Sequence, residues 1–350
     1  MTIASSLYQR LKRYSSPRSD LIHTLPIVIL MPHSACNCRC VMCDIWKGNG
    51  NLKQLREEDI SGLLSSLEKL GTEQILMTGG EALLNPAFFS LCRMLKTLKL
   101  RITLLSTGLT LDKHAVELVK SVDDIIVSLD GDENVHNRIR NIPNAFEKLS
   151  AGIGAIRKIA PRFPITARSV IQQANFRVWP SIIDSAKQMG LNQVSFLPAD
   201  VSSHAFNREV LWSDQRQHEI LPAETDLPAL RSILRKMIKD YRLDFESRFI
   251  AESPEKLGKI FEYYSACYGH NPFPFKKCNA PWVSTVVEPD GTVRPCFFHP
   301  PMGNIRQESL DKIVNREENI SFRKNLDTDK DSTCKKCVCY LHLRPGTKLN

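Results

Sequence analysis

The chain has 350 residues, and 42% of them are hydrophobic, which is enough to bury a substantial core and excludes disordered, collagen-like and small disulfide-stabilised proteins. Its 47 Lys and Arg residues against 38 Asp and Glu give a net charge of +9, which suits an anionic cofactor, an acidic substrate or nucleic acid. The longest strongly apolar stretch, residues 25–31, is far shorter than the roughly 20 residues of a membrane-spanning helix. Because the start of the chain is polar and unlike a secretory signal, we expect a cytoplasmic protein with no membrane partner.

Eleven cysteines are present, an odd number, and seven of them crowd into two short stretches. In a large chain without an export signal, this distribution favours reduced, metal-binding thiolates over disulfides. The two stretches are therefore the first candidates for chemistry.

Short apolar runs alternate with stretches of helical periodicity between residues 26 and 200, after an N-terminal extension of residues 1–25. Strands that are covered by helices read as continuous apolar runs, so the pattern predicts an α/β fold with parallel strands. Six strands are predicted, at residues 26–31, 74–78, 101–106, 124–130, 164–171 and 192–198. A full eight-stranded barrel would need two strands from elsewhere in the chain.

Two of the intervening helices have clear end signals. Asn85 is predicted to cap a helix that has Pro86 at its first position. A second helix is predicted to begin at Pro180 and to end at Gly190.

Four cysteines, Cys36, Cys38, Cys40 and Cys43, lie in the loop that follows the first predicted strand. So dense a set in a loop is better explained by metal ligation than by core packing. Cys36, Cys40 and Cys43 form a C-x3-C-x2-C pattern, whereas structural zinc sites favour two separated C-x2-C pairs. Three thiolate ligands on a four-iron cluster would leave one iron open.

This C-x3-C-x2-C loop after the first strand of a βα repeat resembles the cluster loop of the radical S-adenosylmethionine (SAM) superfamily. The resemblance implies a partial (β/α)6 barrel in which Cys36, Cys40 and Cys43 bind a [4Fe-4S] cluster whose open iron chelates SAM. It also implies reductive cleavage of SAM to a 5′-deoxyadenosyl radical, with an electron donor such as flavodoxin or ferredoxin. Cys38 is an extra thiol, and the resemblance does not make it a ligand.

Further motifs of the same family follow in the same order. Gly79, Gly80 and Glu81 match the GGE motif, which contacts the SAM amino group. The chemistry agrees, because glycines permit a close backbone approach and a carboxylate pairs with an ammonium group. By resemblance, Ser128 contacts SAM and Arg140 meets the SAM carboxylate.

Three other strand-end residues are weaker SAM contacts by resemblance. Ser106 closes the third strand where relatives often have Thr-Asn-Gly, and the Asn is missing here. Phe196 and Leu197 end the sixth strand where relatives enclose adenine, although core packing explains both residues equally well. Asp130 is interpreted as a turn residue before Gly131.

Residues 201–266 are predicted to form a helical connector. Five apolar residues recur there at helical spacing, namely Leu227, Leu230, Leu234, Met237 and Tyr241. An apolar stripe of this kind is expected to pack in the core rather than to bind a cofactor.

Residues 267–350 are predicted to form a second, smaller domain with a hairpin whose strands lie at 283–287 and 292–294. Its four candidate metal ligands are Cys278, Cys296, Cys334 and Cys337. The residues alone leave zinc and an iron-sulfur cluster open. The run resembles the SPASM/twitch extension of radical SAM enzymes, which implies an auxiliary [4Fe-4S] cluster on these four thiolates. Cys339 follows directly and has no assigned role.

Cys267 belongs to neither set of cysteines. It is interpreted either as a buried thiol at a domain junction or, by analogy with radical SAM epimerases, as a hydrogen-atom donor to a substrate radical.

The sequence therefore favours a radical SAM enzyme that abstracts hydrogen from an unactivated C–H bond, with a peptide or protein as the first choice of substrate. The alternative is dehydrogenation or epimerisation of a sugar, an aminocyclitol or another natural product. An electron-transfer protein with two clusters is the alternative of another class, and it would not need the GGE motif. Nucleic acid is an unfavoured partner, because no RNA-binding motif accompanies the positive charge.

Overall fold

The computed structural model describes residues 11–13 and 15–349 and contains a nine-stranded sheet with the strand order β6-β5-β4-β3-β2-β1-β7-β8-β9. Strands β1 to β6 are parallel and follow one another across the sheet in chain order. The nine strands are β1 (Ile27–His33), β2 (Gln74–Gly79), β3 (Arg101–Ser106), β4 (Asp124–Ser128), β5 (Ile165–Ile171), β6 (Gln193–Pro198), β7 (Ser284–Val287), β8 (Thr292–Arg294) and β9 (Gly303–Asn304). The six predicted strands and the α/β fold are confirmed.

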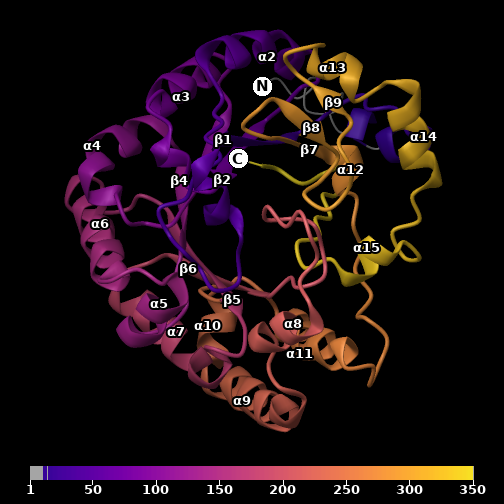
Figure 1. Ribbon diagram of the computed structural model, residues 1–350. Helices are drawn as coiled ribbons and strands as arrows, with labels where there is room; N and C mark the ends of the chain where they lie inside the picture. The colour runs from indigo at the N-terminus through magenta and orange to yellow at the C-terminus, as the bar shows by residue number, and fades with distance from the viewer. Residues whose placement is uncertain (1–10, 14, 350) are drawn as a thin grey trace.

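The helices between these strands lie in an arc on the outer side of the curved sheet (Figure 1). They are α2 (Glu57–Lys69), α3 (Phe88–Lys96), α4 (Leu111–Ser121), α5 (Glu133–Arg140), α6 (Ala145–Ile159) and α7 (Trp179–Gln188). Fully buried strand residues form rows beneath them: Val28 pairs in register with Ile75, and Ile75 with Ile102. Alternation along each strand turns the next residue to the inner face.

The inner face of the sheet is polar at the amino ends of its strands. Arg101 of β3 donates to Asp124 of β4 at 3.0 Å, and the Thr103 hydroxyl donates to the same carboxylate at 3.1 Å. These groups close that end of the partial barrel. The carboxyl ends of the parallel strands, at the other end, carry the predicted site residues.

One predicted helix start is wrong and the other is confirmed. Helix α3 begins at Phe88 and not at Pro86, because Asn85 closes the preceding 3₁₀ turn η2 (Ala82–Leu84). The Asn85 amide donates to the carbonyls of Pro32 and Leu55 at 2.8 and 2.9 Å, so it ties the segment to β1. Helix α7 has Pro180 in its first turn and ends shortly before Gly190, which has a φ of +69°.

The predicted hairpin joins the same sheet. Strand β7 pairs in parallel with β1, while β8 and β9 pair antiparallel beyond it. The first hairpin strand begins at Ser284, since Val283 still belongs to a helical turn. The C-terminal helices are α12 (Ala280–Val283), α13 (Leu310–Ile313), α14 (Glu317–Asn325) and α15 (Ser332–Lys336). The second region is therefore an extension of the barrel sheet past β1.

The described part of the N-terminal segment connects this C-terminal region to the barrel. Ile22 N–H donates to the Asn315 side chain at 2.8 Å, and the Trp282 indole donates to Asp20 at 3.0 Å. Residues 1–10 and 14 of the predicted N-terminal extension lie outside the described residues.

The predicted connector contains the helices α8 (Asp214–Ile220), α9 (Leu227–Asp240), α10 (Arg242–Glu246) and α11 (Pro254–Cys267), together with the 3₁₀ turn η4 (Glu224–Asp226). Two more 3₁₀ turns lie elsewhere in the chain, η1 (Ile45–Gly50) and η3 (Phe176–Val178). Four of the five stripe residues are buried on α9, as core packing requires. Within the described part of the chain, no helix has the length and apolar character needed to cross a bilayer.

Candidate functional site

The first cysteine loop follows β1 and is held by backbone contacts on both sides. Asn49 of η1 accepts from Cys36 N–H at 3.0 Å and donates to Cys36 C=O at 2.9 Å. Farther along, Val41 N–H donates to Ile139 C=O of α5 at 3.1 Å. The loop is therefore fixed by its backbone, and its thiols form no disulfide.

Gly79 and Gly80 allow the end of β2 to touch this loop. A Cβ atom on Gly80 would lie 2.1 Å from Ala35 O, which no real side chain tolerates. Gly79 has a φ of +113°, a conformation that favours glycine. The backbone of Glu81 continues the contact, donating to Ala35 O at 2.9 Å. The GGE motif and the cysteine loop are thus one structural unit.

The Glu81 carboxylate is fully buried and accepts hydrogen bonds from the end of β3. The backbone and the hydroxyl of Thr107 each donate to it at 2.7 Å, and Ser106 donates at 3.0–3.1 Å. Burial raises the pKa of Glu81, and these donors oppose the shift. The Thr107 hydroxyl, whose one proton can serve only one acceptor at a time, also lies 2.9 Å from Asn37 Oδ1, while the buried Asn37 Nδ2 has no hydrogen-bond partner among the described residues. Ser106 therefore acts on Glu81 here, and its direct contact with SAM stays a prediction.

Arg140 lies at the end of α5, directly behind the cysteine loop. Its guanidinium pairs with Asp130 and donates to Cys40 Sγ at 3.5 Å. Asp130 is fully buried, so beyond its interpretation as a turn residue it serves as the carboxylate partner of Arg140. The predicted contact of Arg140 with the SAM carboxylate stays a prediction, and the structure adds that its charge already has a buried partner.

The three predicted ligand thiols lie within electrostatic reach of one another. A hydrogen bond from Cys38 lowers the pKa of Cys40 to about 6 against the effect of burial, and Arg140 contributes to the lowering. Burial raises the pKa of Cys43 to about 12, and the charges of Cys40 and Cys36 add to this shift. Cys38 is fully buried and hydrogen-bonds to the thiols of Cys36 and Cys40, and its exclusion from the ligands stays a prediction.

The predicted SAM contacts on β4 and β6 lie on different faces of the sheet. Ser128 lies on the inner face, in register with Arg168 of β5, whose Nε is buried without a hydrogen-bond partner among the described residues. Phe196 is 1% exposed and packs its ring against Trp179 of α7, with centroids 5.3 Å apart. The Phe196 side chain is therefore in the core and does not face the site, which corrects that prediction. Leu197 alternates to the inner face.

The second cysteine site is assembled from four separate places in the C-terminal region. Cys278 precedes α12, Cys296 follows β8, Cys334 lies in α15 and Cys337 follows it. Burial raises the pKa of Cys296 to about 11, and Cys278 adds to the shift. Burial also raises the pKa values of Cys334 and Cys337, with contributions from Cys296. The four predicted ligands are thus neighbours in space.

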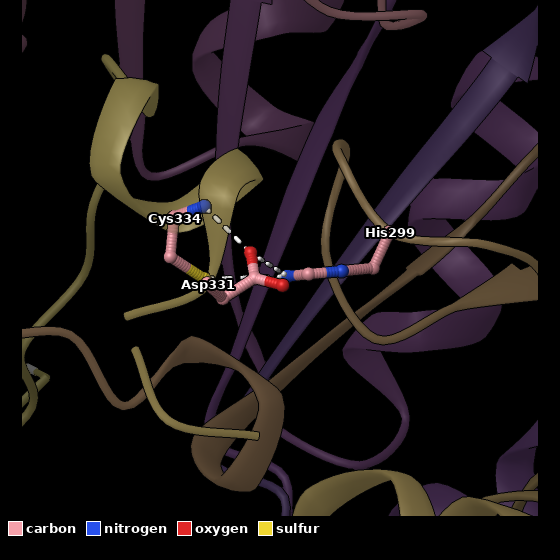
Figure 2. A group of neighbouring side chains, drawn as sticks. All are labelled: His299, Asp331 and Cys334. Atoms are coloured by element: carbon pink, nitrogen blue, oxygen red, sulfur yellow. Dashed lines mark hydrogen bonds and ion pairs between the residues drawn. The ribbon is translucent and has the colours of Figure 1, made fainter. Parts of the chain in front are cut away.

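Two further groups border this second site. The buried His299 places Nε2 3.3 Å from Cys334 Sγ, and Asp331 accepts from Cys334 N–H at 2.8 Å as the cap of α15 (Figure 2). Their N, O and S ligand atoms all lie within 4.8 Å of one another. On another side, Lys276 donates to Cys337 C=O at 2.5 Å and to Lys335 C=O at 2.8 Å.

Cys267 and Cys339 lie between the second site and the barrel. Burial raises the pKa of Cys267, at the end of α11, to about 11, and Tyr263 hydrogen-bonds to it. Cys339 is exposed, and the pKa of its thiol is raised, with the charges of Arg168 and Asp200 acting on it. Neither thiol has a ligand role that the structure assigns.

Comparison with known families matches residues 30–171 to the Radical SAM superfamily and residues 278–338 to SPASM, an iron-sulfur cluster-binding domain. The first match contains the whole loop from Cys36 to Cys43, and the second contains all four C-terminal candidate ligands. The chain belongs to the radical SAM superfamily. It is an enzyme of this family with a C-terminal SPASM domain, and SAM and iron-sulfur clusters are its cofactors.

Relatives of this radical SAM chain have different named activities. It is 26% identical over 316 residues to the AdoMet-dependent heme synthase of Methanosarcina barkeri (strain Fusaro / DSM 804), covering 85% of this chain and 83% of the relative. It is 23% identical over 287 residues to the sporulation killing factor maturation protein SkfB of Bacillus subtilis (strain 168), covering 80% and 62% of the two chains. The fold is similar to that of Streptococcus suis SuiB bound to precursor peptide SuiA, with a TM-score of 0.62, 13% identity and coverage of 97% and 76%.

The residues around both sites fit the cofactors of the family. Three neighbouring thiols suit a cluster with one open iron, and the buried Asn37 Nδ2 offers an unused donor beside them. Asn37, Thr107 and His299 are additions from the structure. The adjacency of Asn37 to Cys36 and of Thr107 to Ser106 was visible in the sequence, whereas nothing there linked His299 to Cys334.

Proposed function

We propose that this radical SAM enzyme abstracts a hydrogen atom from an unactivated C–H bond of a peptide held between the barrel and the SPASM region. When bound, the cluster and SAM supply the 5′-deoxyadenosyl radical. The observation that carries the proposal is the union of the Cys36–Cys43 loop, Gly80 and the buried Glu81 at the carboxyl ends of β1 and β2. An electron-transfer protein has no need of that arrangement.

The residues of the chain have distinct proposed tasks. Cys36, Cys40 and Cys43 hold the first cluster, and the carboxylate of Glu81 orients the SAM ammonium through its fixed position on Thr107. Ser128, on the inner face of β4 at its carboxyl end, holds SAM from a strand that lies two positions across the sheet from β2. The inner side of the sheet and the SPASM region exclude water from the reacting carbon.

A peptide substrate is supported by two comparisons. SkfB is a maturation protein, and SuiB, which has the same fold, is bound to a precursor peptide. The heme synthase relative, which matches over most of both chains, supports a second candidate substrate, an iron porphyrin.

Three further proposals concern the cofactors, the location and the electron supply. The four cysteines of the SPASM region hold an auxiliary [4Fe-4S] cluster. We place the protein in the cytoplasm, with a flavodoxin or ferredoxin as its electron donor.

Anaerobic reconstitution followed by reduction with dithionite in the presence of SAM tests the proposal. We expect about eight iron atoms per chain and formation of 5′-deoxyadenosine. Glu81→Ala should weaken SAM binding while iron content stays unchanged. Protein that holds reducible clusters but neither binds nor cleaves SAM would contradict the proposal and favour the electron-transfer alternative.

Cys267 is proposed as the hydrogen-atom donor to the substrate radical, because it lies between the SPASM region and Asp200 at the end of β6. With the substrate in deuterated water, Cys267→Ala should stop product formation while 5′-deoxyadenosine still forms. Unchanged turnover would make Cys267 a packing residue, and loss of iron would make it a ligand.

A further inference from the structure

A pocket lies at the seam between the barrel and the SPASM region. The carboxyl end of β6, helix α11 and residues 337–340 form its walls. Leu197 borders it on the barrel side, and Cys337 borders it on the SPASM side. A group bound here is therefore next to Leu197, a predicted SAM contact, and to Cys337, a predicted auxiliary ligand.

The charged groups that line this pocket are all cations, namely Lys256, Lys259 and Lys276. Lys259 donates to Phe275 C=O at 2.8 Å, and Lys276 donates to backbone carbonyls. Among the described residues, neither lysine pairs with a carboxylate. The pocket thus has two ammonium groups without a carboxylate partner.

The third lysine is only weakly compensated. Lys256 lies 3.6 Å from Glu252, whose carboxylate already accepts from Ser195 Oγ at 2.9 Å and from Phe196 N–H at 3.1 Å. The Lys256 ammonium also lies 5.6 Å from the centroid of the Tyr340 ring. With three ammonium groups against one carboxylate, the pocket is cationic, while Ile260, Tyr263 and other apolar side chains form the rest of its wall.

The pocket has a volume of about 30 Å³, which admits one small polar group. We propose that it binds a carboxylate group of the substrate, so that the enzyme acts on a carboxylate-bearing molecule. An ammonium group without a carboxylate partner gains more from an anion when it is partly buried, as Lys259 and Lys276 are, than when it is exposed, as Lys256 is. The inference rests on the proposed function and adds the substrate's chemical class. Acidic side chains of a peptide and the propionates of a porphyrin share this chemistry.

Two pairs of probes test the proposal and separate the two sources. A fluorescein-labelled hexaglutamate peptide is compared with its hexaglutamine counterpart, and coproporphyrin III is compared with its neutral tetramethyl ester. We expect at least one acid of these pairs to bind about tenfold more tightly than its neutral partner, with an affinity that falls as salt is added. The pair that discriminates identifies the source of the carboxylate.

The double variant Lys256→Gln/Lys259→Gln should bind the acidic probe about tenfold more weakly than the wild type. Lys236→Gln, on the exposed side of α9, is the matched control and should leave that affinity unchanged. Lys276 is left intact, because it also holds the backbone of Cys337. Iron content and folding by circular dichroism show whether the double variant is otherwise native.

Equal affinity for acid and neutral probes, no binding of either acid at millimolar concentration, or an unchanged affinity in the double variant would each overturn the inference. Wild-type protein that binds and cleaves SAM but does not discriminate the probes contradicts the inference alone. Protein that does not bind SAM contradicts the proposed function itself.

Discussion

The two cysteine sites of this enzyme are built in opposite ways. The barrel site takes its three thiols from one short loop after β1, whereas the SPASM site takes four thiols from separate segments around α12, β8 and α15. At each site, the side-chain amide of one asparagine forms two hydrogen bonds to one backbone residue, an arrangement called here an asparagine clamp. Asn49 bonds to the N–H and C=O of Cys36, and Asn279 bonds to the N–H and C=O of Leu343 at 2.9 Å. The first clamp closes a local loop, and the second holds the end of the chain against Cys278.

The charges around the two sites differ as well. At the barrel site the cation nearest the thiols, Arg140, has a buried carboxylate partner in Asp130. At the SPASM site Lys276 donates to backbone carbonyls and forms no ion pair among the described residues, and His299 meets Cys334. Lys276 therefore has no counter-charge within the described chain, while Arg140 is balanced before any cofactor binds. The comparison predicts that the barrel site keeps its structure without metal better than the SPASM site does.

Removal of the barrel ligands gives the largest effect. The triple variant Cys36→Ala/Cys40→Ala/Cys43→Ala should lose about half of the iron and all formation of 5′-deoxyadenosine, because the two sites share no ligand. Iron analysis and product chromatography measure both outcomes. Cys92→Ala, in the buried face of α3, is the control and should retain its iron. Loss of nearly all iron from the triple variant would show that the sites are not independent.

Next in size is the buried ion pair. Asp130→Asn leaves the Arg140 charge buried without its partner, and we expect a loss of about 3–5 kcal/mol in the free energy of unfolding, measured by denaturant titration. Glu246→Gln breaks the exposed pair with Arg242 and should change stability by no more than about 0.5 kcal/mol. If both variants lost a similarly small free energy of unfolding, the Asp130 carboxylate would not be the partner that neutralises the buried Arg140 charge.

A smaller effect is expected where β2 touches the cysteine loop. Gly80→Ala forces the added methyl group against Ala35 O, and we expect a loss of about 2–3 kcal/mol together with weaker SAM binding. Gly62→Ala has open space in α2 and should instead stabilise by about 0.5–1 kcal/mol. Calorimetric titration measures SAM binding and denaturant unfolding measures stability in both variants. Tight SAM binding by Gly80→Ala would show that the contact between the GGE motif and the cysteine loop is not needed for SAM binding.

The smallest effect concerns the asparagine clamps. Asn49→Ala and Asn279→Ala each remove two hydrogen bonds and should cost about 1–2 kcal/mol. The first should lower occupancy of the barrel cluster and the second that of the auxiliary cluster. Electron paramagnetic resonance of the reduced clusters shows which cluster has lost occupancy. An equal decrease of both signals in each variant would contradict the prediction that each asparagine supports one cluster.

The sequence predicted the barrel well because its information is local. Parallel strands under helices are apolar throughout, and ligands in one loop appear together in the chain, as Cys36, Cys40 and Cys43 do. Helix α9 was similarly visible from its periodic leucines. Phe196 was assigned to SAM because the strand end was known but not the face, and one position along a strand changes the face. Helix α3 began later than predicted because Asn85 bonds to Pro32 and Leu55, which are distant in sequence.

The sequence by itself determined the cysteine loop, the GGE motif, the six strands and the hairpin, since each depends on neighbours in the chain. Tertiary structure alone decided that β7 joins the barrel sheet beside β1, that Asp130 neutralises Arg140, that His299 reaches Cys334 and that three lysines share one pocket. Such pairings are set by which surfaces pack together. Each side chain involved has an ordinary local context, so only the packed chain brings its partner within reach.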